Sequence, residues 1–260
     1  MTSELTAPAG TGTFAPRPGS APRLRQVLAQ ASMESRLLLR NGEQLLIAVV
    51  IPVIVLVGGV RGAERVDLSY DVDTFTPGVL ALAVMSTSFT SLAIATGFER
   101  RYGVIKRLGA SPLSRTGLLA GKVLALLGVQ VLQILVVGTV GLLLGWDPDV
   151  SVLGALLALA AGTSAFASLG LALAGSLRAE ATLAAANLVY LLLMAGGAVV
   201  LPATAYGGFG DVVQWLPSGA LGEAMRAALG AGDLPWRDLF VLFGWAGIGT
   251  AITARTFSWE

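Results

Sequence analysis

Long apolar stretches separated by short polar connections dominate the chain from residue 44 to its end. A helix needs about 20 mainly apolar residues to cross the roughly 30 Å hydrocarbon core of a bilayer. Six stretches approach or exceed this length, at residues 44–60, 77–98, 118–144, 152–177, 182–205 and 238–254. The pattern therefore predicts an all-α integral membrane protein with six transmembrane helices, formed by residues 44–260.

Two different segments precede the first span. Residues 1–21 are rich in Thr, Ala, Gly and Pro and lack the apolar run of a signal peptide, which predicts a disordered cytoplasmic tail. In residues 22–43, apolar side chains recur at helical spacing on one face and four arginines lie around the other. This pattern predicts an amphipathic helix in the headgroup region. A solvated helix bound to a soluble partner remains the alternative.

The distribution of Lys and Arg predicts the orientation. With the N-terminus in the cytoplasm, 13 of the 17 basic residues fall on the inner side and 4 on the outer side. Inner loops of membrane proteins carry the excess of Lys and Arg. Both termini are therefore expected in the cytoplasm.

The connection between the last two predicted spans is too long for a tight turn. It contains apolar runs at 212–216 and 221–229. We interpret 207–232 as a re-entrant segment of two short helices that dip into the membrane from one side. A plain amphipathic surface loop fits the pattern equally well.

Composition narrows the classes of function. Only 13% of the residues are charged, against about 25% in soluble domains. The chain has no Cys and no His, which excludes thiol nucleophiles, imidazole bases and nearly every transition-metal site. We therefore expect no metal site and no cofactor bound by this chain. A net charge of +1 predicts no nucleic-acid partner.

The middles of all six predicted spans lack ionisable residues. Such residues usually serve proton or ion coupling. Their absence therefore weakens the interpretation of the chain as a gradient-driven efflux protein. An ATPase-independent membrane enzyme would need a polar cluster, for which only outer acids qualify, namely Asp67, Asp71, Asp73, Asp147 and Asp149. Both classes stay open as alternatives.

Neutral polar residues inside the spans are the remaining candidates for a substrate pathway. Most of them are expected to serve helix packing. Gln130 and Gln133 are the better candidates, because two amides three residues apart share a face and need partners or water. The candidate residues are Ser88, Ser91, Gln130, Gln133 and Asn187.

The connection at 98–111 carries the most informative pattern. Tyr102, Ile105 and Leu108 recur at helical spacing among cations, and Gly109 with the Ser111-Pro112 pair provides a stop. An excess of inner cations alone would explain the arginines but not this amphipathic element. The pattern predicts a short helix suited to contact another protein.

The same connection resembles the cytoplasmic loop of ABC-2 type ATP-binding-cassette exporter permeases, a family that includes daunorubicin-exporter-like permeases. In that family the loop typically reads Glu-Arg-Glu-x-Gly-Thr-Leu-x-Arg-Leu-x-x-Ser/Thr-Pro. Arg101 stands where a second acid is common, and Val104 where Thr is common. The matching residues are Glu99, Arg100, Gly103, Ile105, Arg107, Leu108, Ser111 and Pro112.

The resemblance implies a coupling helix that docks on a separate ATP-binding subunit. That subunit would hold ATP and Mg, because this chain has no Gly-x-x-x-x-Gly-Lys-Ser/Thr loop. The chain itself would be no enzyme. The ATPase-coupling residues implied in this way are Glu99, Arg100, Arg101, Tyr102, Gly103, Val104, Ile105, Lys106, Arg107 and Leu108.

The resemblance also implies the setting of the chain. It would act in the bacterial plasma membrane, beside a second permease that is either an identical copy or a sister chain. Its expected function is ATP-driven export of an amphipathic drug, antibiotic or lipid.

Overall fold

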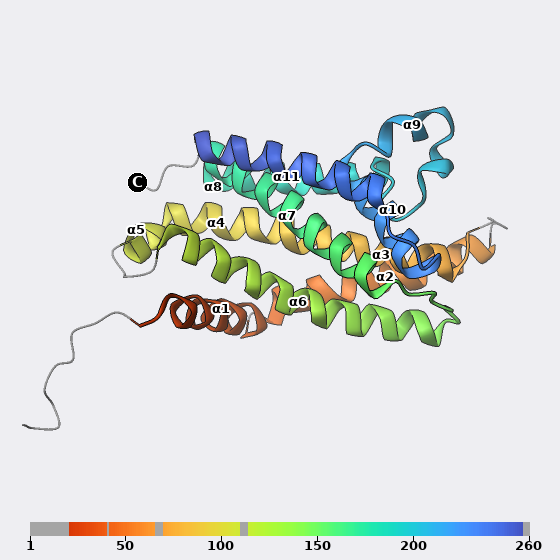
Figure 1. Cartoon of the computed structure of the whole chain (residues 1–260), viewed down its shortest axis with the longest axis horizontal. Coiled ribbons are helices and arrows are strands. Elements are labelled where there is room, and N and C mark those ends of the chain that lie inside the picture. The colour runs from red at the N-terminus through yellow and green to blue at the C-terminus, as the bar shows by residue number, and fades with distance from the viewer. Residues whose placement is uncertain (1–20, 41, 66–69, 110–113, 257–260) are drawn as a thin grey trace, which may run out of the picture.

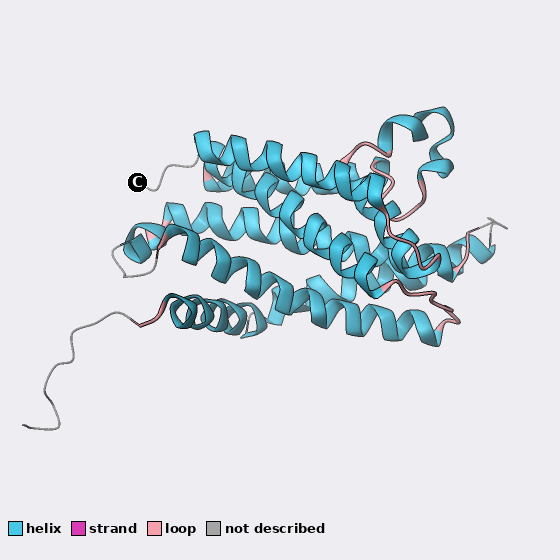
Figure 2. Ribbon diagram, viewed as in Figure 1, coloured by secondary structure: helices cyan, strands magenta, loops and turns pink. Residues whose placement is uncertain are grey.

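The computed structural model describes residues 21–40, 42–65, 70–109 and 114–256, and every regular element within them is helical (Figure 2). The elements are α1 (Arg23–Arg40), α2 (Gly42–Arg65), α3 (Val72–Met85), the π-helix η1 (Ser86–Ser91), α4 (Leu92–Arg101), α5 (Val104–Gly109), α6 (Arg115–Leu143), α7 (Val152–Ser176), α8 (Ala179–Gly196), the 3-10 helix η2 (Ala203–Phe209), α9 (Gly210–Val213), α10 (Pro217–Gly230) and α11 (Trp236–Thr256).

Five helices are long and apolar enough to cross a membrane. They comprise Val72–Arg101, in which α3, η1 and α4 follow one another without a break, Thr116–Leu143, Val152–Ser176, Ala179–Gly196 and Trp236–Thr256. This result confirms an all-α integral membrane protein. The further expected span, 44–60, lies inside the 24-residue helix α2. Its crossing of the membrane, and the side on which the termini lie, stay predictions.

The long helices run side by side, which gives the molecule two distinct ends (Figure 1). One end holds α5 and the last turns of α11, and we call it the α5 end. The opposite end holds α9, α10 and the connection between α6 and α7, and we call it the α10 end. The charge pattern predicts that the α5 end is cytoplasmic.

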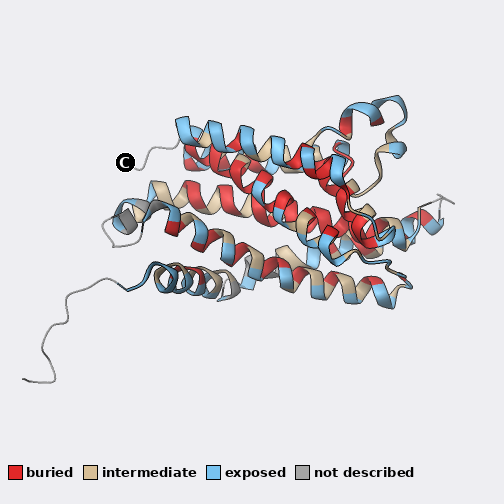
Figure 3. Cartoon of the chain, viewed as in Figure 1, coloured by how far each residue is buried: buried red, intermediate tan, exposed pale blue. Residues whose placement is uncertain are grey.

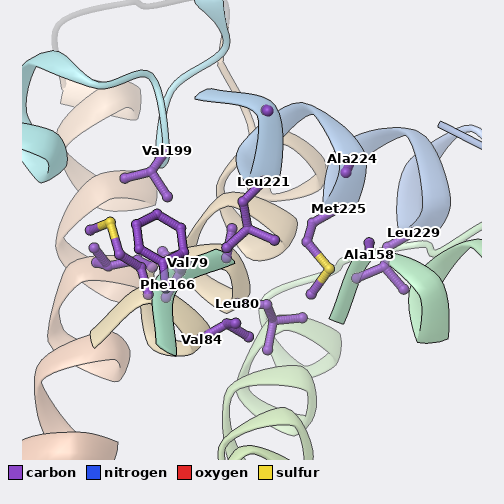
Figure 4. Packing of buried hydrophobic residues seen from close by; sticks show 14 of the residues in the cluster. Val79, Leu80, Val84, Ala158, Phe166, Val199, Leu221, Ala224, Met225 and Leu229 are labelled. Atoms are coloured by element: carbon purple, nitrogen blue, oxygen red, sulfur yellow. The ribbon is translucent and has the colours of Figure 1, made fainter. Parts of the chain in front are cut away.

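The core lies where α3, α7 and α10 meet (Figures 3 and 4). Phe166 of α7 is fully buried and meets Phe89 edge-on, with ring centroids 6.3 Å apart. Leu221 of α10 lies beside it, and Met225 extends the same cluster further along α10. Small residues along α7, such as Ala158, allow this close approach of helices.

For the fifth span, expected at 182–205, the predicted C-terminal end is wrong. Helix α8 stops at Gly196, and residues 197–202 are not helical. This segment is wedged between two helices, because a Cβ on Gly78 of α3 would lie 2.2 Å from the carbonyl oxygen of Val200. On α10, a Cβ on Gly222 would lie 2.7 Å from the carbonyl oxygens of residues 198 and 199. Residues 197–202, which were expected to continue helix α8, instead pack in a non-helical conformation against Gly78 and Gly222.

The shorter elements follow the expected boundaries in part. Helix α1 lies within the expected 22–43 segment and packs on α6, but its Leu24 and Leu28 are exposed. Within the expected 98–111 element, residues 98–101 belong to α4 and α5 covers only Val104–Gly109, while 110 and 111 lie outside the described residues. The 207–232 segment forms the end of η2, then α9 and α10. Its entry into the membrane stays a prediction, and the expected tail, apart from Ala21, lies outside the described residues.

Candidate functional site

A tight turn separates α4 from α5 at the α5 end of the molecule. The backbone N–H of Tyr102 donates to the carbonyl oxygen of Phe98 at 2.9 Å, and that of Gly103 donates to Arg100 at 3.1 Å. Gly103 has a φ of 67°, which glycine adopts without steric cost. The glycine therefore ends α4 and redirects the chain into α5.

The turn and α5 present an exposed aromatic and cationic face. Tyr102 is 64% exposed, and Lys106 and Arg107 are exposed on α5. The Tyr102 ring stacks on Phe98 with centroids 6.2 Å apart, and the Arg101 guanidinium lies 5.9 Å from the Tyr102 centroid. Val104 and Gly103 are half-buried, and the side chains of Ile105 and Leu108 lie outside what the structure describes.

The three residues before the turn contact other helices of the same chain. Glu99 accepts a hydrogen bond from Lys122 of α6 at 2.6 Å. The Arg100 guanidinium donates to the backbone carbonyl of Ala174 near the end of α7. Arg101 forms an ion pair with Glu180 in the first turn of α8. The base of α5 is therefore tied directly to α6, α7 and α8.

Lys122 also ties the amphipathic helix α1 to this base. Its ammonium nitrogen lies 3.1 Å from Glu34 Oε1, and Gln30 donates to the same carboxylate at 2.9 Å. The Lys122 side chain is only 6% exposed. A buried ammonium needs such partners, since burial of an unpaired charge is very costly. Helices α1 and α6 also touch closely here, because a Cβ on Gly121 of α6 would lie 2.6 Å from the Gln30 side chain of α1.

The candidate pathway residues lie in a polar cluster inside the bundle. Gln130 and Gln133 are 0% and 1% exposed. Gln130 donates to Ser88 at 2.8 Å and accepts from Thr163 at 3.0 Å. Gln133 donates to the backbone carbonyl of residue 48 at 2.9 Å. These hydrogen bonds therefore join α6 to α2, η1 and α7 within one chain.

A second oxygen contact completes the Gln133 environment. Its Oε1 lies 2.9 Å from the Thr87 hydroxyl, which is also 2.9 Å from the carbonyl oxygen of Ala83. Ser91, at the end of η1, is half-buried, and Asn187 is exposed on α8. The structure thus brings Ser88 and Gln130 together and leaves Asn187 on an outer face. A pathway role for these residues stays a prediction.

Sequence reasoning missed the role of an arginine at the α10 end. The Arg226 guanidinium donates to the backbone carbonyls of residues 198, 199, 200 and 201 at 3.1–3.4 Å. Glu223, one turn earlier in α10, pairs with Arg226 at 3.2 Å and accepts from the N–H of Ala203 at 2.8 Å. This pair satisfies the backbone groups freed where α8 ends. The sequence did offer a signal for this pair, because Glu223 and Arg226 are opposite charges three residues apart in an otherwise apolar run.

The outer acids do not gather into a cluster among the described residues. Asp71 caps α3 by accepting from the N–H of Thr74 at 3.1 Å. Asp73 accepts from the backbone N–H of Asp147 at 3.0 Å. The described part of the chain holds no group of three acids placed to bind a metal ion. The observed contacts are capping and loop contacts, and Asp67 lies outside the described residues.

The fold and this site define a multi-pass helical membrane protein that presents a short, anchored helix at one end. A family model described as ABC-2 family transporter protein matches residues 65–255. The chain therefore belongs to the ABC-2 transporter family, which confirms the resemblance. Membership makes it the membrane component of a transporter and not an enzyme, and implies an ATP-binding partner subunit. No curated protein and no solved structure matches the chain.

Proposed function

We propose that this chain is the permease subunit of an ATP-driven exporter, and that α5 and Tyr102 dock on a separate ATP-binding subunit. The observation that carries the proposal is the contrast between the two halves of residues 99–107. The first half contacts other helices of the same chain through Glu99, Arg100 and Arg101. The second half exposes Tyr102, Lys106 and Arg107 at the surface of the molecule. An exposed face on an anchored base suits the transfer of force.

The anchoring contacts supply a route for motion. A displacement of α5 would act on α6 and α1 through Glu99, on α7 through Arg100 and on α8 through Arg101. Rigid-body movement of helices is a common form of switching transition. Closure of the partner subunits on ATP would in this way shift several spans together and reshape the space between permeases.

The exposed cations predict the chemistry of the partner surface. Lys106 and Arg107 lie on α5 with no acidic residue in its sequence. Complementary charge favours rapid and specific association. We therefore expect an acidic patch on the ATP-binding subunit, beside a slot that accepts the Tyr102 ring.

The rest of the proposal concerns the assembly and its cargo. A second permease, identical or a sister chain, completes the transporter in the bacterial plasma membrane. The cargo is an amphipathic drug, antibiotic or lipid, and the subtype is daunorubicin-exporter-like. The neutral hydrogen-bond partners of Gln130, which are Ser88 and Thr163, support such a cargo.

The proposal is tested by reversing one exposed charge. Tagged chain is purified in mild detergent from its native host, and the eluate is assayed for a bound ATP-binding subunit and for ATP hydrolysis. Arg107→Glu is expected to lose both while the chain inserts normally. Arg255→Glu, which changes an exposed arginine in the last turn of α11, is the matched control and should retain both. Equal ATPase recovery with the two variants would overturn the assignment of α5.

A further inference from the structure

A polar cleft of about 760 Å³ lies at the α10 end, apart from the coupling site and the polar cluster. Its wall is formed by α10, the first turn of α11, the start of η2 and the connections between these elements (Figure 1). The charge pattern predicts that this end faces the outside of the cell. Five ionisable residues line the cleft, namely Glu223, Arg226, Asp233, Arg237 and Asp238.

The cleft leads from an exposed rim to a buried floor. Trp236 is 68% exposed and Asp233 is also exposed, so both lie at the rim. Asp238 is only 8% exposed, and the neighbouring Pro235 is buried as well. A carboxylate and an apolar surface therefore meet at the floor.

Both arginines of the wall already have acidic partners within the chain. Arg226 donates to four backbone carbonyls and to Glu223, which uses every N–H of its guanidinium. Arg237 donates to Gln214 at 2.9 Å and to Oδ1 of Asp238 at 2.8 Å. The wall therefore offers little to an anion.

The acids of the wall keep free acceptor atoms. Arg237 donates twice to Oδ1 of Asp238, and no other residue in the described part of the chain donates to Oδ2. The Asp233 carboxylate has neither an ion pair nor a hydrogen bond with the described residues. Since Glu223 and Asp238 balance the two arginines, Asp233 carries the one unmatched charge. A carboxylate with an open acceptor gains from a charged donor.

The wall suits an organic cation better than a metal ion. Ca²⁺ needs about six or more oxygen ligands, and the described part of the chain has no group of three acids placed to supply them. An ammonium group needs only the two carboxylates. The face of Trp236 attracts a cation, and the half-buried Leu234 and Ala227 add apolar contact for the rest of such a molecule.

We infer that this cleft binds the ammonium group of an amphipathic amine, with the carboxylates of Asp233 and Asp238 as acceptors and the Trp236 ring beside the apolar part. The inference rests on the proposed function in one respect, because the amine would be the cargo on its outer side. It narrows the cargo from amphipathic molecules in general to cationic ones. The binding itself does not require the ATP-binding subunit.

Binding to the isolated permease tests the inference. The purified full chain in phosphatidylcholine nanodiscs is titrated with a dansyl-alkylammonium probe and with a carboxylate analogue of the same length, and empty nanodiscs serve as the blank. The ammonium probe is expected to bind saturably and about tenfold or more tightly than the carboxylate, as for one charged contact. Equal binding of the two probes, or tighter binding of the carboxylate, would overturn the inference.

Removal of either carboxylate should reduce the affinity for the ammonium probe. Asp233→Asn changes an exposed side chain and should weaken binding about tenfold. Asp238→Asn should also weaken it, and because it releases Arg237, the carboxylate analogue should bind more tightly. Asp211→Asn is the matched control, since Asp211 is exposed on α9 at the same end but does not line the cleft. Wild-type affinity in Asp233→Asn would overturn the inference.

Transport separates this inference from the proposed function. Inverted vesicles should take up the ammonium probe with ATP, and Asp233→Asn should reduce uptake while the ATP-binding subunit still copurifies. Saturable binding without uptake, in vesicles that hydrolyse ATP, would overturn the assignment of the amine as cargo. Intact binding without a copurifying ATP-binding subunit would uphold the cleft and contradict the exporter.

Discussion

The ammonium nitrogen of Lys122 lies 2.6 Å from a carboxylate oxygen of Glu99, which joins the start of α6 to the last turn of α4. The same ammonium contacts Glu34 of α1. Three helices that are distant in sequence are therefore held by one cation next to the exposed helix α5. If α5 receives force from a partner, this ion cluster is one of the contacts through which the force enters the bundle.

Removal of the cation should destabilise the α5 end. Lys122→Met would leave two partly buried carboxylates facing each other, and loss of one partner of a buried pair costs about 3 kcal/mol. We expect a clear fall in the melting temperature of the purified chain. Lys122→Arg should recover most of the stability because it keeps the charge. The same change at the exposed Lys106, Lys106→Met, should have almost no effect on melting. Equal melting of the Lys122→Met and wild-type chains would show that the cluster does not hold the helices.

The carbonyl contacts of Arg226 give a second prediction. Arg226→Lys keeps the charge but replaces a planar group with several donors by a compact ammonium that cannot reach four carbonyls at once. Amide hydrogen exchange in 197–203 should rise by about tenfold or more, corresponding to a loss of about 1.4 kcal/mol.

Arg237→Lys provides the control for that experiment. Arg237 lies at the same end and is half exposed, with contacts to Gln214 and Asp238. Its replacement should leave exchange in 197–203 unchanged. Equal amide exchange in 197–203 for the Arg226→Lys and Arg237→Lys variants would show that Arg226 does not stabilise this segment.

The polar cluster gives a third prediction. Gln130→Leu leaves the Ser88 and Thr163 hydroxyls without their observed partner, at an expected cost of about 1–3 kcal/mol. Adding Ser88→Ala and Thr163→Val removes the orphaned groups and should restore most of the stability, as followed by thermal melting. No recovery in the triple variant would show that the cost arises from lost packing volume.

The same triple variant separates packing from transport. If its stability is restored and export in vesicles is normal, Gln130 serves the packing of the bundle. A restored fold with lost export would assign Gln130 to the substrate pathway. The burial of Gln130 and its hydrogen bonds with Ser88 and Thr163 favour the first result.

Run length and local motifs were sufficient to predict most of the spans. The segments 118–144 and 152–177 coincide closely with α6 and α7, because crossing a bilayer requires long, uninterrupted apolar helices. The amphipathic spacing of residues 102–108 likewise predicted a short helix, but it did not reveal the turn at Gly103 that separates α4 from α5. These features depend on neighbours in sequence, which a single chain displays directly.

Contacts between distant segments could not be predicted in the same way. The apolar run continues through Val199, Val200 and Leu201, so hydropathy does not reveal the end of α8 at Gly196. The break depends on Gly78 of α3 and on Arg226 of α10. In the same manner, residues 99–101 appeared to belong to one docking surface, although their partners lie in α6, α7 and α8.

Disulfide trapping at α5 tests the central claim most directly. The chain has no native cysteine, so Lys106→Cys introduces a single thiol on the exposed face of α5. Paired with cysteines on the ATP-binding subunit that copurifies with the chain, it should form a crosslink, and closing that crosslink should block ATP-dependent transport until it is reduced. Arg255→Cys at the end of α11 should remain uncrosslinked under the same conditions. Crosslinking from Arg255→Cys but not from Lys106→Cys would place the partner elsewhere and contradict the account.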